Sequence, residues 1–213
     1  VGLVKGVTRL LNQPGTSNFL PTGESQALRV MPTVGLEYRY PFINVQPWGT
    51  TTIEPIAQVI IRPNEPYAGK LPNEDAQSFN FDTTNLFSVD KFSGYDRVEG
   101  GSRANAGVNY SGTFANGASI QGTFGQSIQL AGPNSYAVDP VSNVGAYSGL
   151  ESTMSDYVAG VSLDTGTGPR LTARARFDDQ TFNINRAELQ ATTALGPVTA
   201  SASYLYLRNN PNS

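Results

Sequence analysis

The chain has 213 residues, of which 15% are charged, and its formal net charge is −3. It contains neither cysteine nor histidine, so disulfides within the chain, thiolate metal sites and histidine-based catalysis are excluded. The slight acidity argues against a nucleic-acid-binding surface, and no run of about 18 apolar residues predicts a membrane-spanning helix. Because the chain begins at Val1 without a basic and apolar leader, we expect an internal fragment of a longer protein.

Apolar and polar residues alternate with a period of two along most of the chain, the pattern of a β-strand with two different faces. A weak first strand is expected over residues 1–11, and a clear one runs from Leu28 to Phe42. The same alternation predicts further strands over residues 51–62, 103–112, 119–130, 156–163, 170–178, 181–194 and 198–207. The chain therefore predicts an all-β fold of about nine strands, without an amphipathic helix.

The strand from Leu28 to Phe42 shows the two faces most clearly. We expect one face to contact lipid, with Leu28, Val30, Val34, Leu36, Tyr38 and Tyr40. The other face would line a lumen, with Arg29, Glu37 and Arg39. Aromatic residues at a strand end are typical of a membrane interface, although ordinary strand propensity also explains them. In the next strand Ile56 and Ile60 interrupt the polar face.

Strand and loop lengths distinguish a membrane barrel from a soluble sandwich. The predicted strands have about 10–15 residues, whereas strands of soluble proteins have about 5–6 and membrane-spanning strands need about 9–11. Long connections alternate with short ones, except for a short turn at 178–180; the long ones are 12–26, 63–101 and 132–150, and the short ones 43–50, 115–117 and 165–168. This alternation predicts an antiparallel transmembrane β-barrel. Residues 1–213 would be part of a single barrel domain with a long surface loop at about 63–101.

Two segments carry a resemblance to a known family: "TIEPIAQVIIRPNE" and "NFDTTNLFSVDKFSGYDRVEGGSRANAGVNYS". They resemble the barrel domain of the LptD family, also called OstA or Imp. The segment "RVMPTVGLEYRYPF" is similar to the barrel strand that precedes them in that family. The strongest resemblance covers about residues 29–112, and the remainder agrees in pattern.

The resemblance implies a barrel in the outer membrane of a Gram-negative bacterium that inserts lipopolysaccharide into the outer leaflet. It implies four partners: lipopolysaccharide, the lipid bilayer, an LptE-like plug lipoprotein, and an LptA-like periplasmic bridge that acts through an N-terminal domain missing here. No enzymatic activity, cofactor, metal or nucleic acid is expected. The alternatives are a diffusion porin or substrate-specific channel, and a soluble β-sandwich that binds carbohydrate.

The longest loop contains a motif that we expect to cap the pore from outside. Its charges alternate in sign and can pair with one another, its glycines permit tight bends, and its aromatic side chains can form a cluster. The motif comprises Asp82, Phe87, Asp90, Lys91, Phe92, Gly94, Tyr95, Asp96, Arg97, Glu99, Gly100 and Gly101.

Other roles for this loop stay open. Lys91, Arg97 or Arg103 could contact sugar or phosphate directly. The carboxylates of Asp82, Asp90 and Asp96 could hold a divalent cation, although their spacing is not that of an EF-hand. Catalysis lacks a nucleophile with a neighbouring base.

The hairpin from Arg170 to Ala194 predicts a basic stripe on the lumen wall. With a tight turn at Asp179–Gln180, a one-residue bulge near Asn185 keeps arginine out of lipid. The bulge would place Ala173 opposite Ala187, and Leu171 opposite Leu189. It would also turn three arginines inward, with Glu188 as a partial counter-charge: Arg174, Arg176 and Arg186. This stripe could guide anionic groups of lipopolysaccharide, or it could be a salt-bridged structural wall.

Overall fold

The computed structural model describes residues 2–3, 8–9, 27–66, 75–76, 79–137, 145 and 147–208. The regular secondary structure of these residues consists of β-strands, and none of them belongs to a helix that could cross a membrane. The predicted strand at 1–11 is represented by two short described pieces, and the predicted loop at 12–26 lies outside the described residues.

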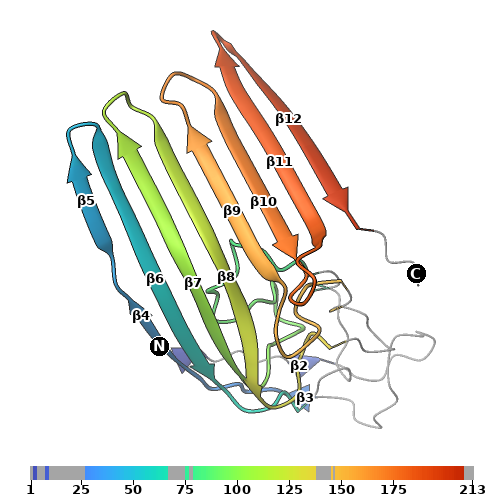
Figure 1. Ribbon diagram of the computed structural model, residues 1–213. Helices are drawn as coiled ribbons and strands as arrows, with labels where there is room; N and C mark the ends of the chain where they lie inside the picture. Colours follow the sequence, from blue (N-terminus) through green and yellow to red (C-terminus); the bar gives the residue numbers. More distant parts are fainter. Residues whose placement is uncertain are drawn as a thin grey trace.

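The strands form an antiparallel sheet in which neighbours in space follow chain order (Figure 1). The order is β1-β4-β6-β7-β8-β9-β10-β11-β12, with β5 also paired with β6, and the described sheet does not close on itself. This confirms the predicted antiparallel all-β class. The members are β1 (Gly2–Leu3), β4 (Thr33–Arg39), β5 (Phe42–Gln46), β6 (Gly49–Ile61), β7 (Ser102–Phe114), β8 (Ser119–Ala131), β9 (Tyr157–Asp164), β10 (Arg170–Phe177), β11 (Ile184–Leu195) and β12 (Val198–Leu207), while β2 (Thr8–Arg9) pairs separately with β3 (Ala27–Leu28).

The connections separate into two ends of the sheet (Figure 1). The turns after β5, β7, β9 and β11 lie at one end, here called the turn end, and the longer connections lie at the other, the loop end. One predicted boundary was wrong: residues 42–46 form β5, and only Pro47 and Trp48 turn. The Trp48 ring stacks on Phe114 with centroids 6.0 Å apart, and its carbonyl accepts from the Ala115 amide at 2.9 Å. These contacts tie the hairpin to the neighbouring turn.

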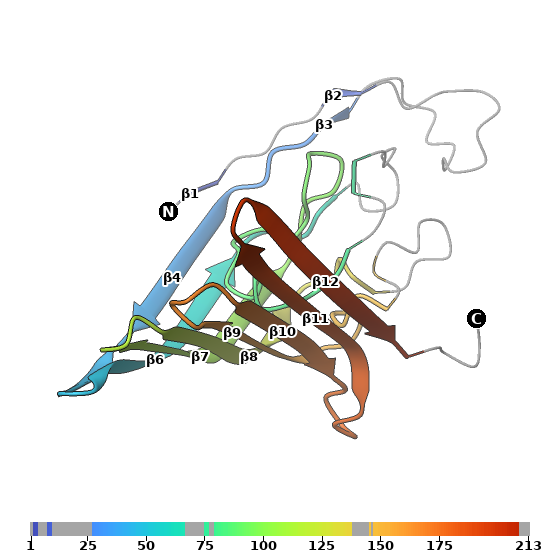
Figure 2. The ribbon, with the colours of Figure 1, turned by 90° about the horizontal axis from the view of Figure 1, so that it is seen from above.

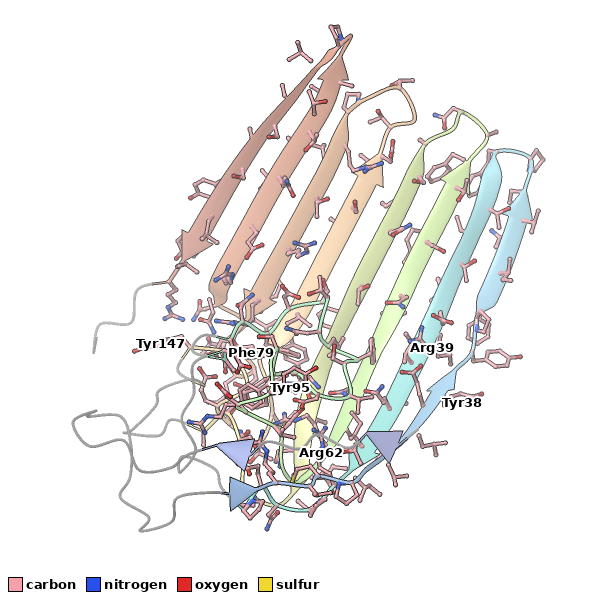
Figure 3. The ribbon with its side chains drawn as sticks, turned by 180° about the vertical axis from the view of Figure 1, so that it is seen from behind. Tyr38, Arg39, Arg62, Phe79, Tyr95 and Tyr147 are labelled. Carbon is pink, nitrogen blue, oxygen red and sulfur yellow. The ribbon has the colours of Figure 1, made fainter. Side chains whose placement is uncertain are left out.

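The sheet curves into a trough with two chemically different faces (Figure 2). Its convex outer face exposes apolar side chains along every long strand, among them Leu36, Ile53, Phe124, Val161, Leu171 and Tyr204. The predicted lipid-facing residues Val30, Val34, Leu36, Tyr38 and Tyr40 are exposed, while the side chain of Leu28 lies outside the described part. Figure 3 shows Arg39 over β6 and Tyr38 beyond the sheet edge. The period-two pattern therefore predicted the two faces correctly.

The β10–β11 hairpin confirms the predicted bulge but corrects the register. Asn185 is bulged, because Phe177 pairs with Ile184 while Arg176 pairs with Arg186. Ala173 lies opposite Leu189, rather than Ala187, and Leu171 lies opposite Ala191, rather than Leu189.

The reason for this difference is the turn, which spans residues 178–183 instead of two residues. The Asp178 carboxylate accepts from the amides of Gln180 and Thr181 at 3.2 and 2.8 Å, which stabilises the longer turn. Because the register error is two residues, each side chain keeps its predicted face.

Candidate functional site

The connection between β6 and β7, here called the β6–β7 loop, folds into the hollow of the trough (Figure 2). Hydrogen bonds join it to other parts. Among them, Gln58 Nε2 donates to the Phe87 carbonyl at 3.0 Å, Arg176 donates to Asn80 Oδ1 at 3.0 Å, and the Phe81 amide donates to the Ser148 carbonyl at 3.0 Å. Figure 3 shows Phe79, Tyr95 and Arg62 crowded at the loop end, and the strands extending beyond them toward the turn end.

The loop divides the inner face into two regions. The covered wall lies beneath the loop and comprises Ile56, Gln58, Ile60, Arg103, Asn105, Gly107, Gly125, Ser127, Val158, Gly160 and Arg176. The open wall lies nearer the turn end and includes Thr52, Ser111, Gln121, Ser162, Thr172, Gln190 and Ser203, which are paired in register across seven strands. Ile56 and Ile60, which interrupt the polar pattern of β6, belong to the covered wall, so the loop explains them.

Three glycines that face inward leave room for the loop to pack against the backbone of the covered wall. Gly107 and Gly125 are direct cross-strand partners on β7 and β8, and Gly160 follows on β9. A methyl group at Gly125 would lie 2.6 Å from Leu86 Cδ2, and one at Gly160 would lie 2.7 Å from Thr83 Oγ1. The absent side chains thus let the loop approach the sheet backbone closely.

An apolar cluster forms between the loop and the covered wall. Its buried members are Ala76, Phe81, Leu86, Phe92, Tyr136, Leu150 and Val158, and Phe79 and Phe87 pack against them. The rings of Phe92 and Tyr136 stack with centroids 4.5 Å apart. The predicted aromatic cluster is therefore correct for Phe87 and Phe92. It is wrong for Tyr95, whose side chain is 65% exposed.

A buried ionic network joins the loop to the wall. The Glu99 carboxylate contacts Arg103 at 2.6 Å and Arg62 at 3.4 Å, and all three side chains are nearly inaccessible to solvent. Arg62 also donates to the carbonyls of Glu99 and Val89 at 3.0 and 2.6 Å. Lys91 Nζ donates to Asn105 Oδ1 at 3.2 Å. Lys91 and Glu99 of the loop attract one another, as predicted, and Glu99 pairs in addition with arginines next to the ends of two strands.

Burial and charge shift two pKa values in this network. Burial lowers the pKa of Lys91 from its usual 10.5 to about 8, against the raising effect of nearby Glu99. Burial alone would raise the pKa of Glu99, but Lys91, Arg103 and Arg62 outweigh it and hold the value below its ordinary 4.5. Glu99 is therefore the anion that makes three buried cations tolerable, since unpaired buried charges are costly.

Arg29 anchors the loop at the edge of the sheet. Its guanidinium donates to the carbonyls of Asp96, at 2.9 Å, and Tyr95, and it lies 3.8 Å from the Glu65 carboxylate. Arg29 was expected to face the lumen, and its side chain is buried beneath the loop. The burial arises because the loop covers this part of the inner face, which alternation along one strand does not reveal.

The model of one protein family, described as LPS transport system D, matches residues 8–213. The chain belongs to the LptD family. No curated protein matches it significantly. LptD proteins are outer-membrane transport and assembly proteins, so the family agrees with a sheet that is apolar outside and polar inside. The resemblance at residues 29–112 is thereby confirmed and extended over most of the chain.

In this LptD chain the alternative roles of the loop residues find little support. Lys91 and Arg103 are buried and bound to protein groups, so neither is available to sugar or phosphate, and Arg97 is also buried. The alternative that Asp82, Asp90 and Asp96 hold a cation is not supported, because among the described residues the acidic cluster with metal-like spacing is Asp156, Asp178 and Asp179.

The glycines of the motif serve as the sequence suggested. Gly94 and Gly101 have φ angles of 76° and 74°, in the left-handed region that favours glycine. At Gly100 a side chain would begin 2.6 Å from the Glu65 amide nitrogen, so close backbone approach requires glycine there.

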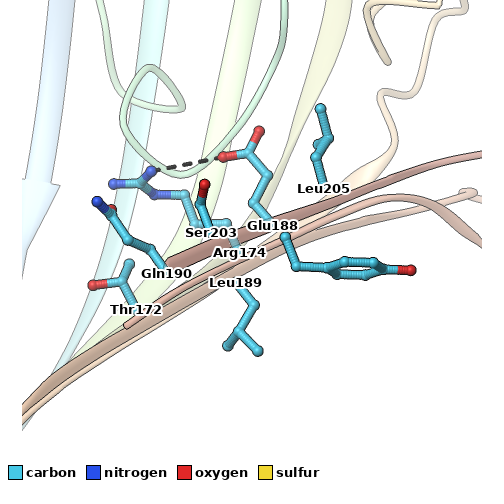
Figure 4. A pocket seen from close by; sticks show the side chains of 8 residues that line it. Thr172, Arg174, Glu188, Leu189, Gln190, Ser203 and Leu205 are labelled. Atoms are coloured by element: carbon cyan, nitrogen blue, oxygen red, sulfur yellow. Dashed lines mark ion pairs between the residues drawn. The ribbon is translucent and has the colours of Figure 1, made fainter. Parts of the chain in front are cut away.

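The three predicted stripe arginines all face inward but differ in environment. Arg176 is buried and bound by Asp156 at 3.1 Å and by the carbonyls of Tyr147 and Ser148 at 2.6 and 2.5 Å. Arg174 and Arg186 are partly exposed and both face Glu188. Figure 4 shows Arg174 and Glu188 joined on the open wall, with Leu189 pointing to the other side.

Sequence reasoning missed several residues of this LptD site. Asn105 links the wall: its amide donates to Gln58 at 2.6 Å, and its oxygen accepts from Ser127 at 2.6 Å. Tyr136 closes the apolar cluster from a different loop. The inward glycines on three adjacent strands were the one available signal, because glycine on a lumen face permits close packing.

Proposed function

We propose that this chain forms part of the wall of an outer-membrane barrel that delivers lipopolysaccharide to the outer leaflet and performs no covalent chemistry. The observation that carries the proposal is the combination of an exposed apolar outer face with a polar inner face that holds a packed loop. In such barrels the outer face contacts lipid and the inner face contacts polar cargo.

The β6–β7 loop would act as a cap that narrows the lumen at the cell surface. Long connections of outer-membrane barrels lie outside the cell, and this loop contributes the motif from Asp82 to Gly101. Its contacts with Arg62, Arg103 and Arg176 hold it against the wall. The cap would prevent leakage of large solutes while lipopolysaccharide passes the open wall.

Family membership supports the remaining partners of this proposal. An LptE-like lipoprotein would occupy the hollow that this chain leaves open, and an LptA-like bridge would deliver lipopolysaccharide through an N-terminal domain outside this chain. The lipid bilayer would surround the outer face. Co-purification of the full-length protein with an LptE-like lipoprotein would separate this function from that of a diffusion porin, which needs no such partner.

Deletion of residues 85–99 in the full-length protein tests the cap. It removes Leu86, Lys91 and Glu99 from the interface but leaves every strand intact. We expect folded barrels that admit large antibiotics or assemble poorly. Alanine at Thr165 and Thr167, in a turn at the opposite end, is the matched control and should have no effect. Unchanged barrier function and unchanged folding in the deletion variant would contradict the capping role.

A further inference from the structure

The open wall contains a groove of about 300 Å³ where β10, β11 and β12 lie side by side (Figure 4). Its inner-face lining comes from two adjacent rungs of the sheet. One rung is Thr172, Gln190 and Ser203, and the next is Arg174, Glu188 and Leu205. The groove therefore offers hydroxyl, amide, guanidinium and apolar groups within one small area, the mixture that saccharides contact.

Arg174 is the cation that lines this groove, and Glu188 is the carboxylate that lines it. Glu188 is the carboxylate shared by two arginines, and Arg186 holds its Oε1 atom at 2.5–2.7 Å. Arg174 reaches only the other oxygen, at 3.9 Å, and its side chain is 38% exposed. Glu188 is thus held mainly by Arg186, which lies beside the groove, whereas Arg174, which lines the groove, makes only the longer contact. An arginine with free donors presents a planar fork to phosphate or carboxylate.

The other arginines near the groove are less available to an anion than Arg174. Arg176 is enclosed by the loop and by Asp156. Arg174 also lines a narrow cleft between the loop and β10, together with Arg186, but Asp82 of the loop faces that cleft. The residues that line the groove toward β12 all come from the sheet. Arg170, on the same strand and face, holds Asp164 at 2.6 Å. The geometry therefore singles out the rung of Arg174.

We propose that Arg174, assisted by Gln190 and Ser203, binds a phosphate or carboxylate group carried on a saccharide. This inference rests on the proposed passage of lipopolysaccharide along the inner wall and assigns one contact point on that path. Leu205 provides an apolar surface for a sugar ring beside the anion. Glu188 keeps the net charge of the site small, which favours release after binding.

Site-specific photocrosslinking in the full-length protein, with its assembly partners, tests the site. A photoreactive residue at Ser201, inward on β12 and outside the groove lining, reports lipopolysaccharide nearby. We expect Arg174→Gln to reduce the crosslink roughly tenfold, the size expected from losing one charged hydrogen-bonded contact. Arg170→Gln is the matched control and should leave the crosslink unchanged. Glu188→Gln should increase it, an effect that a purely structural ion pair would not produce.

Competition identifies the ligand group. A sugar phosphate and a sugar carboxylate should both reduce the crosslink, whereas the neutral sugar should not. Inorganic phosphate that competes as well as the sugar phosphate would show that the anion alone is recognised and would overturn the saccharide assignment. Equal crosslinking in the Arg174→Gln and native proteins, or equal loss in the Arg170→Gln control, would overturn the site.

A second crosslinking position can contradict the proposed site without contradicting the proposed function. A second photoreactive residue at Thr52, on the open wall of β6, records passage elsewhere in the lumen. Crosslinks at Thr52 that persist, with none at Ser201 in the native protein, would overturn the site and leave the transport function standing. Absence of crosslinks at both positions, together with normal delivery to the surface, would overturn both.

Discussion

The covered and the open walls are built from the same strands but use different side chains. Beneath the loop the inward positions of β7, β8 and β9 include glycine at three places, and polar groups there are bound to protein partners. Toward the turn end the inward positions carry hydroxyl, amide and charged side chains that remain accessible. On β10 and β11 the positions level with the loop hold arginines instead of glycines.

The difference shows how one polar face can both bind its own loop and leave a path open. Glycine lacks the side chain that would keep the loop away from the sheet. The buried ionic network then compensates the charges of the loop. On β10, Arg176 is buried against the loop, whereas Arg174 remains partly exposed. The contacts that each inward side chain makes with the loop therefore determine where the inner face is covered and where it is open.

The largest effect should come from breaking the buried network at Glu99. Glu99→Gln leaves Arg62 and Arg103 without their carboxylate, and we expect loop docking to weaken by about 3–5 kcal/mol. Hydrogen exchange of residues 88–101 measures this. Glu54→Gln, which removes an accessible partner of Arg39 on the open wall, should cost at most about 1 kcal/mol. Similar losses of docking free energy in both variants would show that burial of the Glu99 ion pairs does not strengthen loop docking.

Arginine substitutions on one pair of threonines compare the two walls directly. Thr33 is buried at the covered edge of the sheet, whereas Thr52 belongs to the open wall. Thr33→Arg should destabilise the barrel by about 3 kcal/mol, since it buries an unpaired charge. Val34→Arg, on the outer face, should cost about 2–4 kcal/mol in a bilayer. Thr52→Arg should change the free energy of unfolding little, and a folding assay in lipid vesicles would detect the contrast.

Loop docking should strengthen with rising pH. The pKa of Lys91 is about 8 when the loop is docked and near 10.5 when it is exposed, so the undocked loop binds more protons between these values. The equilibrium constant for docking is lowest below pH 8. It should increase by roughly two orders of magnitude between pH 8 and about pH 10.5. Protease sensitivity of the loop against pH measures this. Lys91→Met should remove the dependence, and a curve that keeps its slope in that variant would refute the assignment to Lys91.

The smallest effect concerns the glycines. At Gly160 the three atoms nearest to the Cβ of valine would all belong to the Thr83 side chain in the loop, so we expect docking to weaken by about 1–3 kcal/mol while the strands stay paired. Gly122→Val is the matched control, because the nearest atom to a methyl group there is 3.6 Å away. Cysteines at Thr83 and Gly160 should also form a disulfide, since Thr83 Cβ lies 3.5 Å from the methyl position at Gly160. Failure of that pair to crosslink under oxidation would show that the loop does not pack on this wall.

The strands, their faces and the placement of long and short connections were predictable from the residues themselves. Alternation is a local property of an extended chain, so Leu36 and Tyr38 could be assigned outward, and Glu37 and Arg39 inward, without any partner strand. The bulge at Asn185 was predictable for the same reason, because without it Arg186 would turn toward lipid.

Only the tertiary structure decided which inward residues are free. Arg174 and Arg176 are two positions apart on one strand and cannot be distinguished by pattern, yet one faces the open groove and the other is enclosed by Asn80, Ser148 and Asp156. Likewise, Tyr95 and Phe92 belong to one short motif, but only Phe92 enters the cluster with Tyr136. The physical reason is that burial depends on contacts between segments far apart in sequence, and a long loop can fold back over any part of a wall whose side chains leave room for it.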